Sequence, residues 1–349
     1  MKNYYLNSLL TNKLFMKFST CHLIGKATLC YTLFLCFVFT SNAQESKKRL
    51  PIIDVHVHAM GGNPNASPMC PWFLKDMPGS GPNQEPPSFM SADCISPLQP
   101  ARSDAEMDAA ILRANKELNI TMVVSGDAKA IHRWHKAAPD HIIPSLGISN
   151  ADAMTVEAFR DSLSTGFYKV MGEVAPQYQG MSPSDMSLDE YFGVAEELGI
   201  PVGIHMGTGG NGMANINRPK YRASLGQPFL LEDMLARHPK LKIWVMHAGY
   251  PMVDQMIALM GANAYVYVDL AGFIWSYPLE EIHAYLKRLV QAGFSKRIMY
   301  GTDLMIWPEL LETSIEVIES ANYLSEEQKR DIFFNNAVRF FNLDASKFE

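Results

Sequence analysis

Residues 51–60 read PIIDVHVHAM, an apolar run in which His56 and His58 stand two positions apart. Side chains two apart in a β-strand project from the same face, so these two imidazole rings point the same way. Two rings placed like this reach one metal ion at nitrogen–metal distances of about 2.0–2.1 Å. The stretch therefore predicts a strand that ends in a pair of metal ligands, although an H-x-H pair alone is a weak signal.

Seven more β-branched or apolar runs follow this one and alternate with amphipathic helical patterns. The eight predicted strands span 52–58, 120–126, 142–148, 167–174, 202–207, 242–249, 265–272 and 297–303. Such alternation is typical of βαβ units around a parallel sheet, and strands this apolar fit a sheet covered on both faces. Eight units favour an α/β fold of the (β/α)8 TIM-barrel type, a single domain over 51–349. No G-x-G-x-x-G follows the first strand, so the dinucleotide-binding alternative lacks its motif.

A long insertion interrupts the alternation after the first strand. Residues 60–102 are rich in Pro, Gly, Ser and Asn and show no sustained period. In a barrel this loop lies over the C-terminal mouth, where long loops commonly act as lids. Ser103 and Glu106 after it form a capping-box pattern that begins a helix. A second Gly-rich insertion, 208–227, follows the fifth strand on the same rim.

The N-terminus has the pattern of a secretory signal peptide. Four lysines and no acid precede a run of about 14 apolar residues, which is shorter than the roughly 20 needed to span a bilayer. We expect cleavage after Ala43, a short linker over 44–50, and a periplasmic or extracellular protein with no stable membrane span. Export leaves Cys70 and Cys94 in an oxidising compartment, where we expect a disulfide, with two free thiols as the alternative.

Charge and composition disfavour some partners. The chain has 349 residues, 48% of them hydrophobic, and a formal net charge of −6. It lacks the basic surface that nucleic-acid binding requires, so we expect a small-molecule substrate instead. The oligomeric state stays open, a homo-oligomer included.

Four further polar residues fall at the ends of predicted strands: Glu173 on the fourth, His205 on the fifth, His247 on the sixth and Asp303 on the eighth. Taken singly, each has an ordinary structural explanation, such as a core histidine or an N-capping aspartate. In a barrel, however, these strand ends converge on the rim where active sites lie, so together with the H-x-H pair they predict a shared metal site. The remaining histidines are interpreted as surface or packing residues: His132, His135, His141, His238 and His283.

These motifs, in this order, resemble the metal-dependent amidohydrolase superfamily over residues 51–344. The segments MHAGYP (246–251) and NNAVRFFNL (335–343) particularly resemble amidohydrolase family 2, which includes the aminocarboxymuconate-semialdehyde decarboxylase type. The resemblance implies a (β/α)8 barrel with a divalent metal at its mouth. It is much less specific about the reaction.

The resemblance leaves open whether the site holds one ion or two. In the superfamily the fourth-strand position often carries a carboxylated lysine or a glutamate that bridges two metals. Glu173 fits the glutamate version, with His56, His58 and Asp303 on one ion and His205 and His247 on the other. Lys169 is a poorer candidate for the bridge, and Glu173 alternatively orients a histidine without binding metal.

We therefore expect a hydrolase that cleaves an ester, lactone or amide of a small substrate. A bound divalent ion lowers the pKa of its water to about 7, and the resemblance gives Asp303 the role of accepting and returning the proton. In a one-ion site His247 is free to act as acid or base. Imidazole and carboxylate ligands suit zinc, manganese or iron, and zinc is favoured. The alternatives are a mononuclear decarboxylase and a non-catalytic ligand-binding barrel.

Substrate contacts are predicted only from position, in segments that follow strands. Arg218 and Arg222 are candidates to bind a substrate carboxylate. The full set of candidate pocket residues is Tyr178, Arg218, Tyr221, Arg222, Tyr250, Trp275 and Trp307.

Overall fold

A computed structural model describes residues 49–72, 83, 94–148, 154–210, 212–215 and 218–348. The predicted signal peptide, 1–43, and most of the linker after it lie outside the described residues. Within the described part of the chain, no helix combines the length and apolar character needed to cross a membrane.

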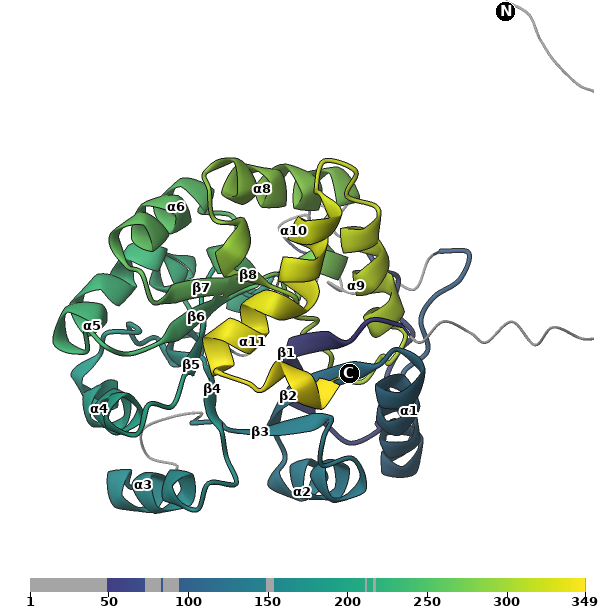
Figure 1. Ribbon diagram of the computed structural model, residues 1–349, viewed down its shortest axis with the longest axis horizontal. Helices are drawn as coiled ribbons and strands as arrows, with labels where there is room; N and C mark the ends of the chain where they lie inside the picture. The colour runs from purple at the N-terminus through teal and green to yellow at the C-terminus, as the bar shows by residue number, and fades with distance from the viewer. Residues whose placement is uncertain are drawn as a thin grey trace, which may run out of the picture. The chain divides into compact units, whose positions relative to one another are not determined.

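The core of the protein is one sheet of eight parallel strands that neighbour one another in chain order (Figure 1). This arrangement confirms the predicted (β/α)8 TIM barrel, and all eight predicted strands are present, most of them shorter than expected. The strands are β1 (Ile52–Ala59), β2 (Ile120–Gly126), β3 (Ile142–Leu146), β4 (Val170–Val174), β5 (Val202–His205), β6 (Ile243–Met246), β7 (Val266–Asp269) and β8 (Ile298–Met299).

The barrel closes where β1 meets the chain that follows the short strand β8. The Val55 amide donates to the Tyr300 carbonyl at 3.0 Å, and the Asp303 amide donates to the His56 carbonyl at 2.8 Å. The buried Asp54 carboxylate strengthens this seam, because it accepts from the amide and the hydroxyl of Thr302 at 3.0 and 2.5 Å. Closure thus brings Asp303 beside the two histidines of β1.

Helices surround the barrel and bury their apolar faces against the outside of the strands (Figure 1). They are α1 (Asp104–Glu117), α2 (Ala128–Ala137), α3 (Val156–Ser164), α4 (Asp189–Leu198), α5 (Glu232–Arg237), α6 (Val253–Ala262), α7 (Phe273–Ser276), α8 (Leu279–Gln291), α9 (Leu310–Glu319), α10 (Glu326–Arg330) and α11 (Asn336–Phe341). At the start of α1 the Ser103 side chain accepts from the Glu106 amide, while Glu106 accepts from the Arg102 amide instead of from Ser103.

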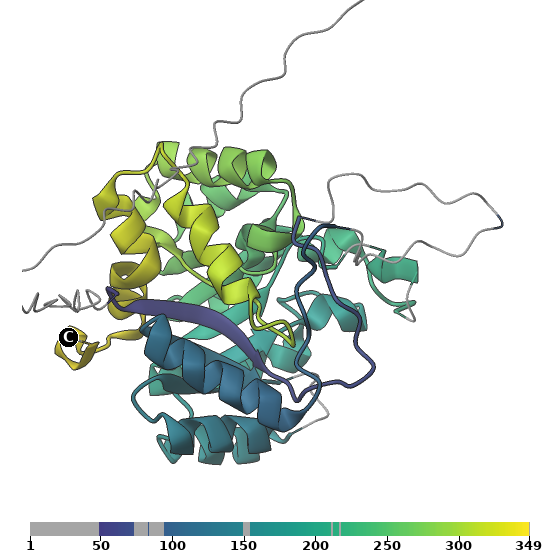
Figure 2. The same ribbon diagram turned by 90° about the vertical axis from the view of Figure 1, so that its right-hand side faces the viewer.

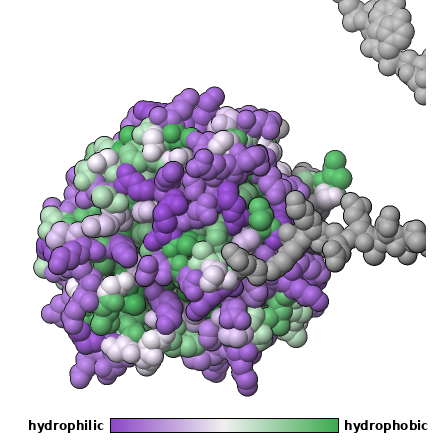
Figure 3. Space-filling model, viewed as in Figure 1, coloured by the Kyte–Doolittle hydropathy of each residue, from purple (hydrophilic) through white to green (hydrophobic). Residues whose placement is uncertain are grey.

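The C-terminal segment closes one end of the barrel. Helices α10 and α11 are joined by the π-helical turn Asp331–Asn335, so the expected closing helix is present. Phe334 and Phe340 pack against interior side chains near the starts of their strands, including Ile53, Val170 and Trp244. Hydrophilic side chains predominate on this face of the molecule, with small apolar patches between them (Figure 3).

The described parts of the long insertion lie at the opposite end of the barrel (Figure 2). Cys70 and Cys94 form the predicted disulfide. Beside it, Met69 and Leu98 exchange backbone hydrogen bonds at 3.0 and 2.7 Å. The Trp72 amide donates to the Trp275 carbonyl at 2.6 Å, so the insertion is tied to the segment that follows β7.

Candidate metal centre

The structure brings all six predicted ligands together at the C-terminal ends of the strands. Five distances between imidazole nitrogens and carboxylate oxygens in this cluster lie between 2.5 and 3.6 Å. Glu173 is the penultimate residue of β4, as in the predicted strand. Two residues lie further along relative to the strand ends than expected: His247 begins the turn after β6, and Asp303 follows β8 by four residues. The metal-binding role of the six residues stays a prediction.

One half of the cluster consists of the β1 histidines and Asp303. Asp303 Oδ1 lies 2.9 Å from His58 Nε2 and 3.6 Å from His56 Nε2. Four ligands at about 2.0–2.1 Å from a tetrahedral ion stand about 3.3–3.4 Å apart. The two separations in this half are close to that value, so the geometry fits one shared ion.

The other half consists of His205 and His247. His247 Nε2 lies 2.9 Å from His205 Nδ1, and Glu173 Oε1 lies 2.5 Å from that Nδ1. The second Glu173 oxygen, Oε2, faces the first half instead, at 3.4 Å from His58 Nε2 and 3.8 Å from His56 Nε2. Glu173 therefore stands between the two halves and presents one oxygen to each.

Asp269, at the end of β7, contacts two of the predicted ligands from the barrel interior. It was not among the predicted site residues. It is fully buried, and its Oδ2 lies 3.2 Å from His56 Nδ1. Its Oδ1 accepts from the His247 amide at 2.8 Å. The residue stands at a strand end like the predicted ligands, so the same positional rule identifies it once applied to the seventh strand.

Local backbone geometry places the ligands as well. His247 and Asp303 both have φ of 59°, a left-handed conformation that non-glycine residues seldom adopt. Gly172, just before Glu173, has φ of 156°, and a Cβ there would lie 3.1 Å from the Gly203 carbonyl oxygen. Unusual conformations of this kind concentrate at functional sites.

The ligands perturb one another's protonation in the metal-free protein. Burial disfavours the charged form of His58, but hydrogen bonds with Asp303 and Glu173 outweigh burial and raise its pKa to about 9. Burial likewise opposes the charge of Glu173, yet the positive field of His205 and hydrogen bonds from the histidines hold the pKa of Glu173 well below its ordinary value. Protons on the histidines therefore balance the two carboxylates where a divalent cation would otherwise do so.

A metal ion fits these residues. His56 Nε2 is buried and has no hydrogen-bond partner among the described residues, although it faces Glu173 and Asp303. A buried polar nitrogen without a partner destabilises the folded protein unless a ligand binds it. An imidazole whose Nδ1 is hydrogen-bonded to a carboxylate is a common metal ligand. Three residue groups here are spaced to hold an ion: His56 with His58 and Glu173, Glu173 with His205 and His247, and His56 with His247 and Asp269.

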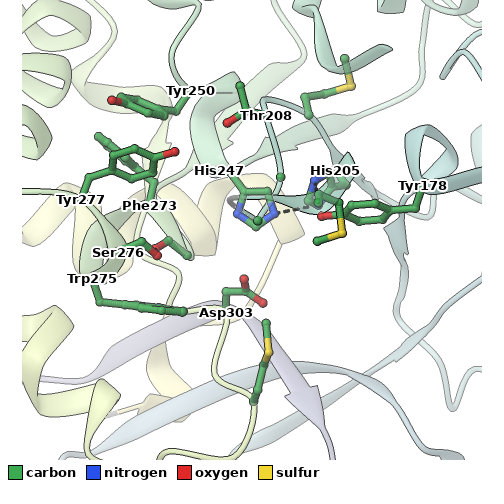
Figure 4. Close-up of a pocket in the computed structure, with 16 residues that line it drawn as sticks. Tyr178, His205, Thr208, His247, Tyr250, Phe273, Trp275, Ser276, Tyr277 and Asp303 are labelled. Carbon is green, nitrogen blue, oxygen red and sulfur yellow. Dashed lines mark hydrogen bonds between the residues drawn. The ribbon is translucent and has the colours of Figure 1, made fainter. Parts of the chain in front are cut away.

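Cavities open on both sides of the centre. One of about 230 Å³ lies toward β7, with the aromatic side chains of Tyr250, Phe273, Trp275 and Tyr277 facing the centre from the side opposite Tyr178 (Figure 4). Another, of about 350 Å³, lies toward β2 and β3 and is lined by polar groups that include Ser125 and Arg218. The centre thus separates an aromatic cavity from a polar one.

The structure corrects some of the predictions. Lys169 precedes β4 and is exposed, so it is no candidate for a bridging ligand; the register shift between Met171 and Val174 breaks the strand parity on which that alternative depended. Tyr178, Arg218, Tyr250 and Trp275 line the cavities as predicted, whereas three candidates line none of the described cavities: Tyr221, Arg222 and Trp307.

Comparison with known proteins gives the class of the chain. Residues 53–343 match the amidohydrolase family, so the chain belongs to that family, which is metal-dependent. No curated protein matches it.

Solved structures share its fold at low sequence identity. An uncharacterised TIM-barrel protein from Bordetella bronchiseptica is 18% identical with a TM-score of 0.56, covering 84% of this chain and 99% of its own. A probable 2-pyrone-4,6-dicarboxylic acid hydrolase from Acinetobacter baumannii, with citric acid bound, is 11% identical with a TM-score of 0.54, covering 84% and 100%. A 5-carboxyvanillate decarboxylase from Novosphingobium aromaticivorans, complexed with manganese and a nitrobenzoic acid, is 15% identical with a TM-score of 0.50, covering 66% and 79%. The fold accommodates both hydrolases and decarboxylases, so the choice between them depends on this chain's own site.

Proposed function

We propose that this chain is a hydrolase that cleaves an ester, lactone or amide bond of a small substrate with the help of two divalent ions. The observation that carries the proposal is the position of Glu173, whose Oε2 lies 3.4 Å from His58 and whose Oε1 lies 2.5 Å from His205. A carboxylate that serves two ligand sets in this way is suited to bridge two ions. Two-metal sites are typical of hydrolytic enzymes, such as aminopeptidases and phosphatases.

The donor set indicates how the ions would be held. His56, His58 and Asp303 would hold one, His205 and His247 the other, and Glu173 both. Imidazole and carboxylate donors without thiolates suit zinc best, with manganese and iron also compatible. When bound, such ions lower the pKa of a water molecule and polarise a carbonyl group.

Asp303 would move the proton during the reaction. The positive field of His56 and the hydrogen bond with His58 lower its pKa despite burial, so the carboxylate is ionised at neutral pH. It borders the aromatic cavity, within reach of a bound substrate. We infer that Asp303 accepts a proton from the attacking water and passes it to the leaving group.

His247 is held for a ligand role. Its Nδ1 lies 2.8 Å from the Ala271 carbonyl oxygen, to which the ring can only donate, so the neutral ring has its lone pair on Nε2, which faces Glu173 and His205. In a site with one ion, the same nitrogen would be free to act as an acid or base. We also propose that the protein is exported, a proposal that the Cys70–Cys94 disulfide supports because disulfides persist in oxidising compartments.

The test combines metal content with a substrate panel. We expect about two ions per chain in the purified protein, and hydrolysis of aryl esters, lactones or anilides without release of CO2 from aromatic carboxylates. Glu173→Gln should leave about one ion and lower hydrolysis at least about 10²-fold, because one ion supplies several kcal/mol of charge stabilisation. Glu190→Gln, at an exposed position on α4, is the matched control. One ion per chain, activity indifferent to Glu173→Gln and CO2 release would instead identify the decarboxylase.

A further inference from the structure

Tyr178 lies against the metal centre without being a ligand of it. It belongs to the short 3-10 turn Pro176–Gln179 that follows β4, and its hydroxyl oxygen lies 3.0 Å from His205 Nε2. The two rings are 4.7 Å apart, and Tyr221 stacks on Tyr178 at 5.9 Å. The ring is therefore held in place, with its hydroxyl beside a proposed ligand.

The hydrogen atoms around this hydroxyl can be assigned from the bonding of His205. In the metal-free protein its Nδ1 donates to the Glu173 carboxylate, which can only accept, at 2.5 Å; an ion held by Nδ1 would require the lone pair on that nitrogen instead. With an ion on Nδ1, the neutral ring would carry its hydrogen on Nε2 and donate it to the Tyr178 oxygen. The backbone N–H of Gly210 is the other partner of this oxygen, and it too can only donate. In the metal-loaded protein the hydrogen of the Tyr178 hydroxyl would therefore have no acceptor among the described residues.

This spare donor faces the space where a substrate would bind. Tyr178 borders the aromatic cavity, the polar cavity and the cavity of about 280 Å³ between them, which His58, Glu173 and Asp303 also line. Figure 4 shows its hydroxyl directed toward the histidines, across the pocket from Trp275 and Tyr277. A carbonyl group bound between the two outer cavities lies within reach of this hydroxyl.

We propose that Tyr178 is a catalytic residue that donates a hydrogen bond to the substrate carbonyl oxygen as negative charge develops on it, an inference that rests on the proposed hydrolase function. When a water oxygen adds to the carbonyl carbon, one water proton passes to Asp303 and the π electron pair moves onto the carbonyl oxygen. When the double bond forms again, the bond to the leaving group breaks and that group takes the proton from Asp303. Tyr178 keeps its own proton throughout and stabilises the intermediate oxyanion.

The test is Tyr178→Phe in the zinc-loaded protein, with Tyr221→Phe as the matched control. Tyr221 donates its hydroxyl to the Thr208 carbonyl, so this control also removes a tyrosine hydroxyl bond next to the site. We expect Tyr178→Phe to keep the wild-type zinc content and to lower kcat for an aryl ester about 10²–10³-fold with little change in KM, the usual effect of losing one oxyanion donor. The control should change kcat less than about threefold, within the range of ordinary substitutions near a site.

A second readout does not depend on turnover. A phosphonate monoester, such as 4-nitrophenyl methylphosphonate, carries the tetrahedral geometry and anionic oxygens of the intermediate, and calorimetry measures its binding. We expect Tyr178→Phe to bind it at least about tenfold more weakly than wild type does. Equal phosphonate binding by the two proteins, or zinc loss in Tyr178→Phe, would overturn the proposal, because the hydroxyl would then act only on His205 or not at all. Phosphonate binding that depends on Tyr178, without hydrolysis of any ester, would support the role of Tyr178 as a hydrogen-bond donor but contradict the proposed hydrolase function.

Discussion

His56 Nδ1 lies 3.2 Å from Asp269 Oδ2, and both side chains are buried beneath the metal centre. The same oxygen accepts from the indole of Trp244 at 3.1 Å, and the other oxygen accepts from the His247 amide at 2.8 Å. One carboxylate on β7 thus orients a ring on β1 and the backbone of a residue after β6. Carboxylates that hold the far nitrogen of a ligating histidine commonly set its tautomer and orientation.

Asp269→Asn should weaken zinc binding about 10–100-fold, the usual cost of losing such a partner. The asparagine amide would place hydrogens against groups that donate to both oxygens of Asp269, so at least one contact is lost. Titration against a chromogenic chelator measures the affinity. Asp189→Asn is the control, because Asp189 pairs with Arg237 and His238 on the outer helices. If Asp269→Asn bound zinc as wild type does, the orienting role would be wrong.

Sequence patterns predicted the fold and most of the site because both follow from position along strands. Strand ends converge in a barrel, so the sequence alone places Glu173, His205, His247 and Asp303 together. Parity within a strand was less reliable: it put Lys169 on the inner face, and the register shift in β4 left it exposed. Such shifts depend on hydrogen bonds with neighbouring strands, which a single sequence does not specify. Asp269 follows the strand-end rule but pairs with other side chains, and that pairing is visible only in three dimensions.

Zinc binding should release protons even at pH 8. An ordinary histidine is already neutral at that pH, but hydrogen bonds with Asp303 and Glu173 outweigh burial and raise the pKa of His58 to about 9 in the metal-free protein. Zinc must displace this proton, so affinity should rise with pH up to about 9 and then level off. Calorimetry at pH 8 in buffers of different ionisation enthalpy counts the released protons. A heat of binding that is the same in every buffer would contradict the raised pKa.

Removing the Cys70–Cys94 disulfide should destabilise the protein and loosen the aromatic cavity. The bridge closes a loop of 24 residues next to Trp72, whose amide donates to the Trp275 carbonyl. A C70S/C94S double variant should lose about 2–4 kcal/mol of unfolding free energy, measured in urea, because its unfolded chain is less constrained. We expect KM for aryl substrates to rise while zinc content stays at the wild-type value, since no predicted ligand lies in the insertion. An unchanged KM would show that the insertion does not hold Trp275 in its position beside the aromatic cavity.

The opposite end of the barrel should govern stability without governing metal binding. Phe340 is 3% exposed and packs edge to face on Trp244 at 5.8 Å. Phe340→Ala should cost about 3–5 kcal/mol, as large cavities in cores do, and thermal or urea unfolding measures this. Zinc content should not change, because the ligands lie at the other ends of the strands, where barrels carry function rather than stability. Trp244 also donates to Asp269, which orients His56. A fall in zinc affinity in this variant would therefore show that packing around Trp244 affects the position of His56 through Asp269.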